Sequence, residues 1–185
     1  MNATEALLLA LHEKHQLQHE KEGTLPVTDY VEEWEAPCYL KEHLESGEEQ
    51  IAWKWVKQQP KTDFANVEKA LELEIDSQLQ NFFATVWAGD IDVSFRDRAL
   101  TLLQVQGPED MERLQQNLIG HVMMKQRLKQ PITWFIGLTD EDDLLLTVSQ
   151  ETGVVGLEYV GKEQHEVLSS DLPTFLKELE LIGHS

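Results

Sequence analysis

The chain is short of basic residues. Its 185 residues include 15 Lys and Arg against 34 Asp and Glu, which gives a formal net charge of −19. Nucleic acids and anionic lipid headgroups are bound mainly through basic surfaces, so this composition disfavours both as partners. The complementary expectation is a basic partner.

The chain also lacks a second cysteine and any long apolar run. Cys38 is alone, so no internal disulfide can form, and we expect a buried, inert thiol in a reducing compartment. The N-terminal apolar run ALLLAL follows no basic region and is typical of an amphipathic helix, not a signal peptide. No window approaches the roughly 20 apolar residues of a membrane span. We therefore expect a cytosolic protein that does not insert into lipid.

The apolar spacing and the turn signals predict an α+β fold with one mostly antiparallel sheet covered by helices. We expect one domain over residues 1–185, in which 1–60 is a helix followed by a loop-rich section and 61–185 holds the core helices and strands. The predicted helices are 4–20, with Thr4 as its cap and Gly23 after its end, 64–82, 108–129 and 171–182. The predicted strands are 51–56, 84–88, 91–96, 99–106, 132–138, 144–149 and 154–160. Gly120, within the third helix, suggests close packing there.

Acidic residues gather along the predicted helix 64–82. On a helical wheel, Glu68, Glu72 and Asp76 follow an i, i+4, i+8 spacing that borders the apolar stripe. Acids in that position can line the wall of a groove beside the core, so we name these three as candidate partner-binding residues. The alternative is a solvated helix flank, and Asp63 is interpreted as the helix cap.

Two other clusters could carry chemistry. Asp90, Asp92 and Asp97 alternate near a predicted strand and could hold a divalent metal, although a turn and a polar strand face explain them more simply. His12, His15 and His19 share one helix face and could bind zinc or nickel, but their spacing is common in amphipathic helices.

No nucleophile-elbow, P-loop or dinucleotide-binding motif is present. His121 could act as a general base, yet no nucleophile pattern accompanies it, and a hydrogen-bonded histidine between helix and sheet is the simpler interpretation. We therefore predict a protein that is not an enzyme and needs no metal and no cofactor.

Several segments together resemble the Syd family of SecY-interacting proteins of Gram-negative bacteria. They are NVEKALELEIDSQLQNFFATVWAGD, LTLLQ, NLIGH, KQRLKQP and TWFI, and the resemblance covers about residues 64–182. It implies a protein that binds basic cytoplasmic loops of the SecY channel through an acidic concave face. It also implies a peripheral location on the cytoplasmic side of the inner membrane, and monitoring or negative regulation of faulty or uncomplexed SecY. We expect a monomer.

The resemblance extends to a wider superfamily of Knr4-like and toxin-immunity proteins, which leaves two alternatives. One is an immunity protein or nucleic-acid mimic whose acidic face blocks the basic cleft of a toxin. The other is a metal-dependent hydrolase built on Asp90, Asp92 and Asp97.

Overall fold

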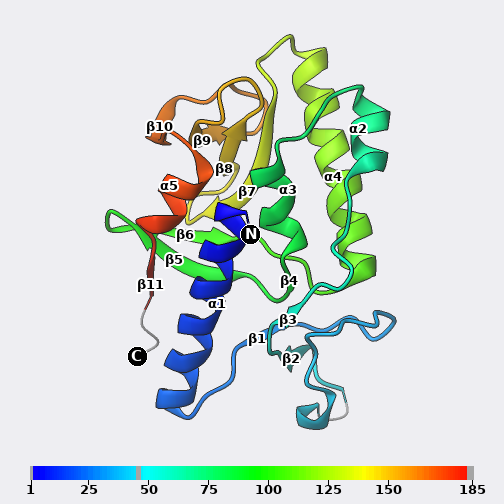
Figure 1. Ribbon diagram of the computed structural model, residues 1–185, viewed down its shortest axis with the longest axis vertical. Coiled ribbons are helices and arrows are strands. Elements are labelled where there is room, and N and C mark those ends of the chain that lie inside the picture. Colours follow the sequence, from blue (N-terminus) through cyan, green and yellow to red (C-terminus); the bar gives the residue numbers. More distant parts are fainter. Residues whose placement is uncertain (1, 45–46, 183–185) are drawn as a thin grey trace.

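The computed structural model describes residues 2–44 and 47–182, and Figure 1 shows its mixed arrangement of helices and strands. The helices are α1 (Ala3–Glu22), the short 3-10 helix η1 (Lys41–His43), α2 (Ala65–Leu71), α3 (Ser77–Ala84), α4 (Pro108–Arg127) and α5 (Leu172–Lys177). The strands are β1 (Val27–Asp29), β2 (Gln50–Ala52), β3 (Val56–Lys57), β4 (Val86–Trp87), β5 (Ile91–Phe95), β6 (Arg98–Leu102), β7 (Thr133–Thr139), β8 (Leu144–Ser149), β9 (Val155–Tyr159), β10 (Glu166–Ser169) and β11 (Glu180–Leu181). Within these ranges, no helix is long and apolar enough to cross a membrane.

Seven strands form one antiparallel sheet in the order β10-β9-β8-β7-β6-β5-β11. Short hairpins join most neighbours, as the short gaps between the predicted strands require. Strands β1 and β2 form a separate antiparallel pair, as do β3 and β4. The predicted α+β class and mostly antiparallel sheet are confirmed.

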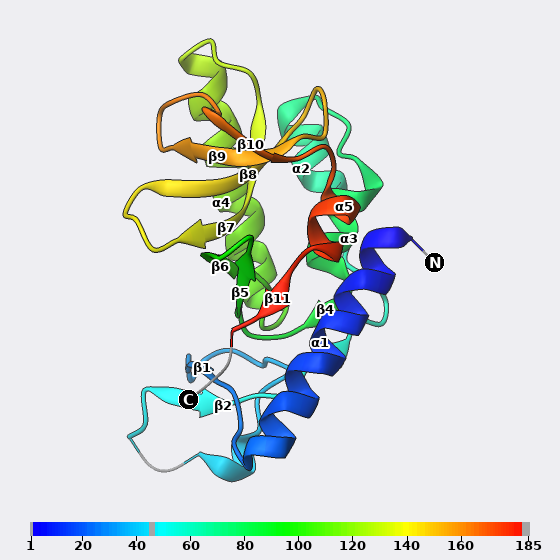
Figure 2. The same ribbon diagram turned by 90° about the vertical axis from the view of Figure 1, so that its left-hand side faces the viewer.

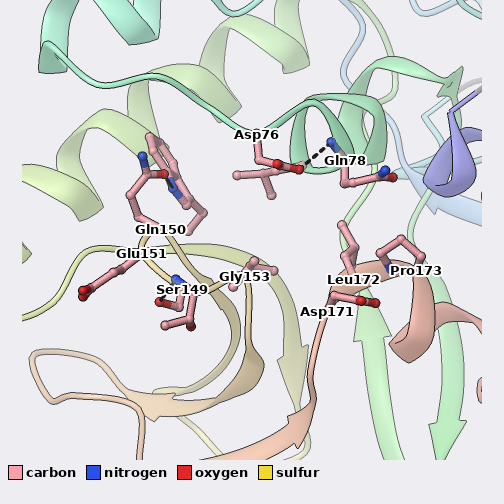
Figure 3. A pocket seen from close by; sticks show the side chains of 13 residues that line it. Asp76, Gln78, Ser149, Gln150, Glu151, Gly153, Asp171, Leu172 and Pro173 are labelled. Carbon is pink, nitrogen blue, oxygen red and sulfur yellow. Dashed lines mark hydrogen bonds between the residues drawn. The ribbon is translucent and has the colours of Figure 1, made fainter.

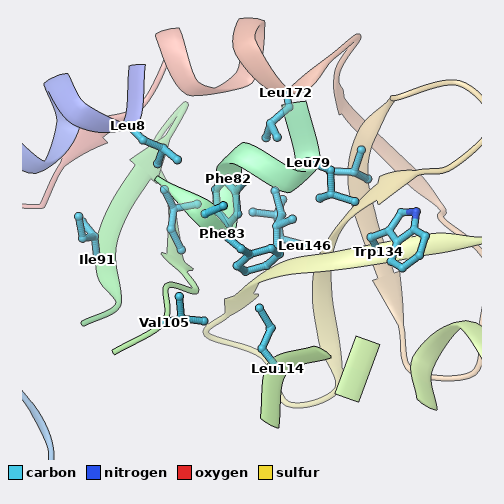
Figure 4. Packing of buried hydrophobic residues seen from close by; sticks show 14 of the residues in the cluster. Leu8, Leu79, Phe82, Phe83, Ile91, Val105, Leu114, Trp134, Leu146 and Leu172 are labelled. Carbon is cyan, nitrogen blue, oxygen red and sulfur yellow. The ribbon is translucent and has the colours of Figure 1, made fainter. Parts of the chain in front are cut away.

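The sheet is covered by helices on both faces. Figure 4 shows side chains of α1, α3 and α5 converging on one face, with Leu114 of α4 on the other. Phe82, Phe83, Trp134 and Phe175 are almost completely buried in this core. Figure 2 shows that α1 runs past the sheet, so that its C-terminal end lies beside the β1–β2 pair.

Local signals explain the ends of α1. Asn2 caps the helix, because its Oδ1 accepts the N–H groups of Thr4 at 2.9 Å and Glu5 at 3.4 Å. The prediction of Thr4 as the cap is therefore wrong. Gly23 ends the helix with a left-handed φ of 67°, as the sequence predicts.

The predicted continuous helix over 64–82 is wrong, because the segment contains two helices, α2 and α3. Glu72 has a left-handed φ of 54° and ends α2. Asp76 then starts α3, since its Oδ1 accepts the N–H of Gln78 at 2.8 Å. The apolar positions Leu71, Ile75 and Leu79 nevertheless all remain buried, so the apolar spacing of a continuous helix persists across the break.

Three further expectations need correction. The helix predicted over 171–182 ends at Lys177, and the chain continues as the edge strand β11, which pairs with β5. Strand β10 was not predicted. A Cβ added at Gly120 would meet nothing within 4 Å, so this glycine does not mark close packing.

Candidate functional site

An acid-lined groove lies between α3, the β8–β9 turn and the start of α5. Its volume is about 360 Å³, and Figure 3 shows Asp76 and Gln78 on one side, facing the β8–β9 turn and the first residues of α5. In the described chain its wall contains no Lys, Arg or His. The lining residues are Asp76, Gln78, Leu79, Trp134, Val148, Ser149, Gln150, Glu151, Thr152, Gly153, Asp171, Leu172 and Pro173.

Two of the three groove carboxylates also cap helices. Asp76 caps α3, and Asp171 caps α5 by accepting the N–H of Thr174 at 2.8 Å. Hydrogen bonds from Thr174 hold the pKa of Asp171 below its ordinary value, so this group stays ionised at neutral pH. The third carboxylate, Glu151, is exposed in the β8–β9 turn. Because both helix N-termini are already occupied by acids, the groove presents negative charge.

A glutamine fixes the floor of the groove to its rim. The indole Nε1 of Trp134 donates to Gln150 Oε1 at 2.7 Å, and Gln150 Nε2 donates to the backbone oxygen of Glu74 at 2.7 Å. The β8–β9 turn is thereby tied to the segment between α2 and α3. The groove therefore has a defined wall on both sides.

The three sequence-predicted acids do not share one stripe, because the helix that would have aligned them is broken. Only Asp76 lines the groove. Glu68 is half-buried and accepts the N–H of Ile75 at 2.9 Å through Oε2, which stabilises the reversal of the chain after α2. Glu72 is exposed in that reversal. Binding roles for Glu68 and Glu72 stay predictions.

Sequence reasoning missed Glu151 and Asp171 as groove residues. Asp171 precedes Leu-Pro, a helix-start signal, and Glu151 lies in the polar turn QETG. These signals give the local structure of each acid. They do not place it beside Asp76, because the sheet brings together segments about 75 and 95 residues apart.

The three aspartates near β5 do not form one cluster, because Asp97 lies apart from Asp90 and Asp92. Asp90 precedes the strand and Asp97 lies in the β5–β6 turn, at opposite ends of a five-residue strand about 17 Å long. Asp90 Oδ1 accepts the N–H of Gln104 at 2.8 Å, and Asp92 Oδ1 accepts the Thr101 hydroxyl at 2.8 Å. Among the residues described, no group of three or more His, Cys, Asp or Glu could hold a metal ion.

The histidines of α1 contribute to packing. His12, His15 and His19 are all buried, and the ring of His15 stacks on Trp53 with centroids 5.5 Å apart. His12 Nε2 lies 3.0 Å from Gln104 Oε1. This face therefore attaches α1 to the β1–β2 region and to the segment that follows β6.

Burial of His12 predicts a loss of stability in acid. Burial lowers the pKa of His12 from 6.5 to about 4, so the fold favours the neutral ring. The stabilisation is complete above pH 6.5 and is lost as the pH falls towards 4, at up to about 1.4 kcal/mol per pH unit. His12→Gln keeps a donor for Gln104 and cannot titrate, so its urea-unfolding free energy should fall less over this window than that of the parent. Equal slopes would contradict this account.

His121 belongs to a buried polar network between α4 and the sheet. Its Nε2 lies 3.0 Å from Thr133 Oγ1 and 3.9 Å from Glu158 Oε2. Burial lowers the pKa of His121, although Glu158 opposes this effect. Lys125 Nζ donates to Glu158 Oε2 at 2.7 Å, and Thr147 Oγ1 donates to Glu158 Oε1 at 2.7 Å. His121 is therefore a hydrogen-bonded histidine between α4 and the sheet, which is the simpler of the two interpretations of the sequence.

Comparison with known proteins identifies the family. The family model described as "Syd protein (SUKH-2)" matches residues 5–180. Protein Syd of Pseudoalteromonas atlantica is 40% identical over 163 residues, covering 88% of this chain and 86% of that protein. Protein Syd of Idiomarina loihiensis is 44% identical over 150 residues, covering 80% of each chain. The chain belongs to the Syd family.

The Syd match extends well beyond the segments that carry the sequence resemblance. It includes most of α1 and the β1–β2 region, and it contains every residue that lines the acid-lined groove. Protein Syd of Colwellia psychrerythraea aligns over 93% of this chain at 36% identity, so the similarity reaches into the N-terminal third. The resemblance to Syd is confirmed, and the N-terminal section is part of the family's sequence pattern.

Proposed function

We propose that this protein binds a basic polypeptide in the acid-lined groove, and that the partner is the set of basic cytoplasmic loops of SecY. The observation that carries the proposal is the composition of the groove wall. Among the described residues that line it, three are carboxylates and none is basic. Membership of the Syd family and the net charge of −19 support the same partner chemistry.

The groove is suited to binding and not to turnover. Its carboxylates are held as helix caps or exposed in a turn, and each can accept hydrogen bonds from lysine or arginine. We propose a monomer that is not an enzyme, acts on the cytoplasmic side of the inner membrane and monitors or restrains faulty or uncomplexed SecY. The membrane contact then goes through SecY and not through lipid.

The protein should co-sediment with inner membranes that contain excess SecY, and salt should release it. Exposed charge pairs weaken as the Debye length falls from about 10 Å at 0.1 M salt to about 3 Å at 1 M. Sedimentation across a salt series, with SecY-depleted membranes as the control, measures this. Equal binding to protein-free anionic liposomes would contradict a contact made through SecY.

The sequence resemblance to toxin-immunity proteins supports one alternative, an immunity protein that blocks a basic toxin cleft. The same groove and charge would serve it. A pull-down from cells lacking excess SecY separates the two functions. An immunity protein would recover a soluble toxin and no translocon component, whereas a SecY-binding protein would recover SecY.

A further inference from the structure

A second cleft lies between the C-terminal half of α1 and strand β1, far from the acid-lined groove along the chain. It consists of two adjoining cavities of about 380 and 160 Å³. We call it the α1–β1 cleft. Both cavities are lined by His15, His19, Thr24, Leu25, Pro26 and Trp53. None of these residues lines the groove.

One part of the α1–β1 cleft is apolar and open. Trp53 forms its buried wall, held by stacking on His15. Leu25 and Val27 lie at its mouth and remain 45% and 56% exposed. Large apolar side chains that stay exposed beside an aromatic wall favour contact with another apolar group.

The larger cavity ends at two carboxylates, Asp90 and Asp92, and no Lys or Arg of the described chain lines it. Desolvation by the surrounding protein, together with the charges of Asp110 and Asp92, raises the pKa of Asp90 to about 6, although the residue is exposed at the surface. Each carboxylate accepts one hydrogen bond from the protein through Oδ1, which leaves capacity for further donors. A cation placed here would be favoured by both charges.

A backbone edge borders the same cavity. In the described chain β1 pairs only with β2. Pro26 accepts from the N–H of Trp53, and the N–H of Tyr30 donates to Glu49, so both residues are bonded towards β2. Hydrogen bonding alternates along an antiparallel strand, so Val27 directs its N–H and C=O away from β2. Val27 also lines the cavity, so its backbone lies beside the cleft, whereas the outward C=O of Asp29 already accepts from the Tyr39 hydroxyl at 3.4 Å.

We propose that the α1–β1 cleft binds an extended peptide segment that adds to the edge of β1, with an apolar side chain against Trp53 and a Lys or Arg side chain at Asp90 and Asp92. Edge addition supplies backbone hydrogen bonds, and the cleft supplies side-chain selectivity. The inference does not rest on the proposed function, because the two sites share no lining residue.

The test uses a blocked peptide, acetyl-Gly-Leu-Arg-Leu-Arg-Gly-amide, titrated into the full chain labelled with ¹⁵N. The Val27 amide and the Trp53 indole should shift together as the peptide binds. A peptide with Glu for both Arg residues, and one with Gly for both Leu residues, should bind at least about tenfold more weakly. Equal binding of the acidic peptide would overturn the proposal, as would shifts confined to the groove or no shift at all.

Matched variants locate the site. Asp92→Asn keeps an acceptor for Thr101, and Leu25→Ser removes only an exposed apolar group; each should weaken binding about tenfold. Asp142→Asn in the β7–β8 turn and Val167→Ser on β10 are the matched controls, since both positions are exposed and lie outside the two sites, and these variants should bind like the parent. Equal weakening in a control and its partner would overturn the assignment. If a variant fails to fold, the chemical-shift changes of the Val27 amide and the Trp53 indole in the parent protein decide whether the peptide binds in the cleft. Arginine amide binding as tightly as the peptide would indicate a small-cation site instead of strand addition.

Discussion

Replacing Lys125 with methionine should destabilise the protein by about 3–5 kcal/mol, the usual cost of leaving one partner of a buried ion pair uncompensated. Lys125 and Glu158 are both 0% exposed, and they join α4 to β9 at a distance of 2.7 Å. Natural domains are stable by only about 5–15 kcal/mol, so the variant should lie close to unfolding at room temperature. Urea unfolding at neutral pH measures the change.

The expected destabilisation arises mainly because Lys125→Met leaves the buried charge of Glu158 unpaired, and not only because the attraction between the two side chains is lost. Lys125 Nζ also donates to the backbone oxygen of Lys162 at 2.7 Å and to Gln130 Oε1 at 3.1 Å, so its removal leaves three acceptors without this donor. Adding Glu158→Gln to the methionine variant removes the charge and keeps an acceptor for Thr147. The double variant should therefore be more stable than Lys125→Met alone.

Two results would contradict this account. One is a loss below about 1 kcal/mol for Lys125→Met, which is the scale of an exposed ion pair. The other is a double variant less stable than the single variant, which would mean that packing of the lysine stem, and not charge, holds α4 against the sheet. Arg98→Met is the matched control, since Arg98 pairs with Glu166 at the surface and should cost much less.

The sequence predicts helix α4 well because its signals are local. Pro108 is at its first position, acids lie in its first turn and bases in its last. The same local reasoning fails for Lys125. In the sequence it belongs to the basic run KQRLK at the end of the helix, whereas the fold buries it against Glu158, which is 33 residues away. Sequence pattern alone gives no sign of such a pairing.

Strands β10 and β11 escaped prediction for a related reason. Each has at most four residues, and each is held by pairing with a neighbour distant in the sequence or across a turn. The break after Leu71 is different, because Glu72 needs a left-handed conformation that glycine or asparagine usually signals. The hydrogen bond from Ile75 N–H to Glu68 helps to offset the cost of the left-handed conformation at Glu72, and this bond is visible only in the structure.

The acid-lined groove combines residues that local signals predict with a spatial arrangement that they do not predict. Each of its acids has a local explanation, as a cap or as a turn residue, and none of these explanations predicts that they meet. The composition does predict that the charge of the groove is negative, because 34 acids and 15 bases leave few cations to neutralise it. The described chain places Lys61, Arg96, Arg98, Arg113 and Lys125 in ion pairs elsewhere.

Neutralising the groove should weaken binding to SecY-containing membranes by at least about tenfold, which corresponds to about 1.4 kcal/mol. The test variant combines Asp76→Asn, Glu151→Gln and Asp171→Asn. Asparagine keeps the side-chain oxygen that caps α3 and α5, so the fold should survive while the net charge changes by three. The dependence of binding on salt should also become shallower, because fewer charges meet in the complex.

The matched control is Asp140→Asn, Asp142→Asn and Glu163→Gln, three exposed acids outside the groove that change the net charge equally. Circular dichroism first establishes that both triple variants fold. If only the groove variant loses binding, location matters and the groove is the site. If both lose binding equally, the acids act as a general field that attracts a basic partner without a defined contact. If neither loses binding, the basic partner is bound elsewhere, and Glu68 and Glu72, the two sequence-predicted acids outside the groove, become the next residues to neutralise.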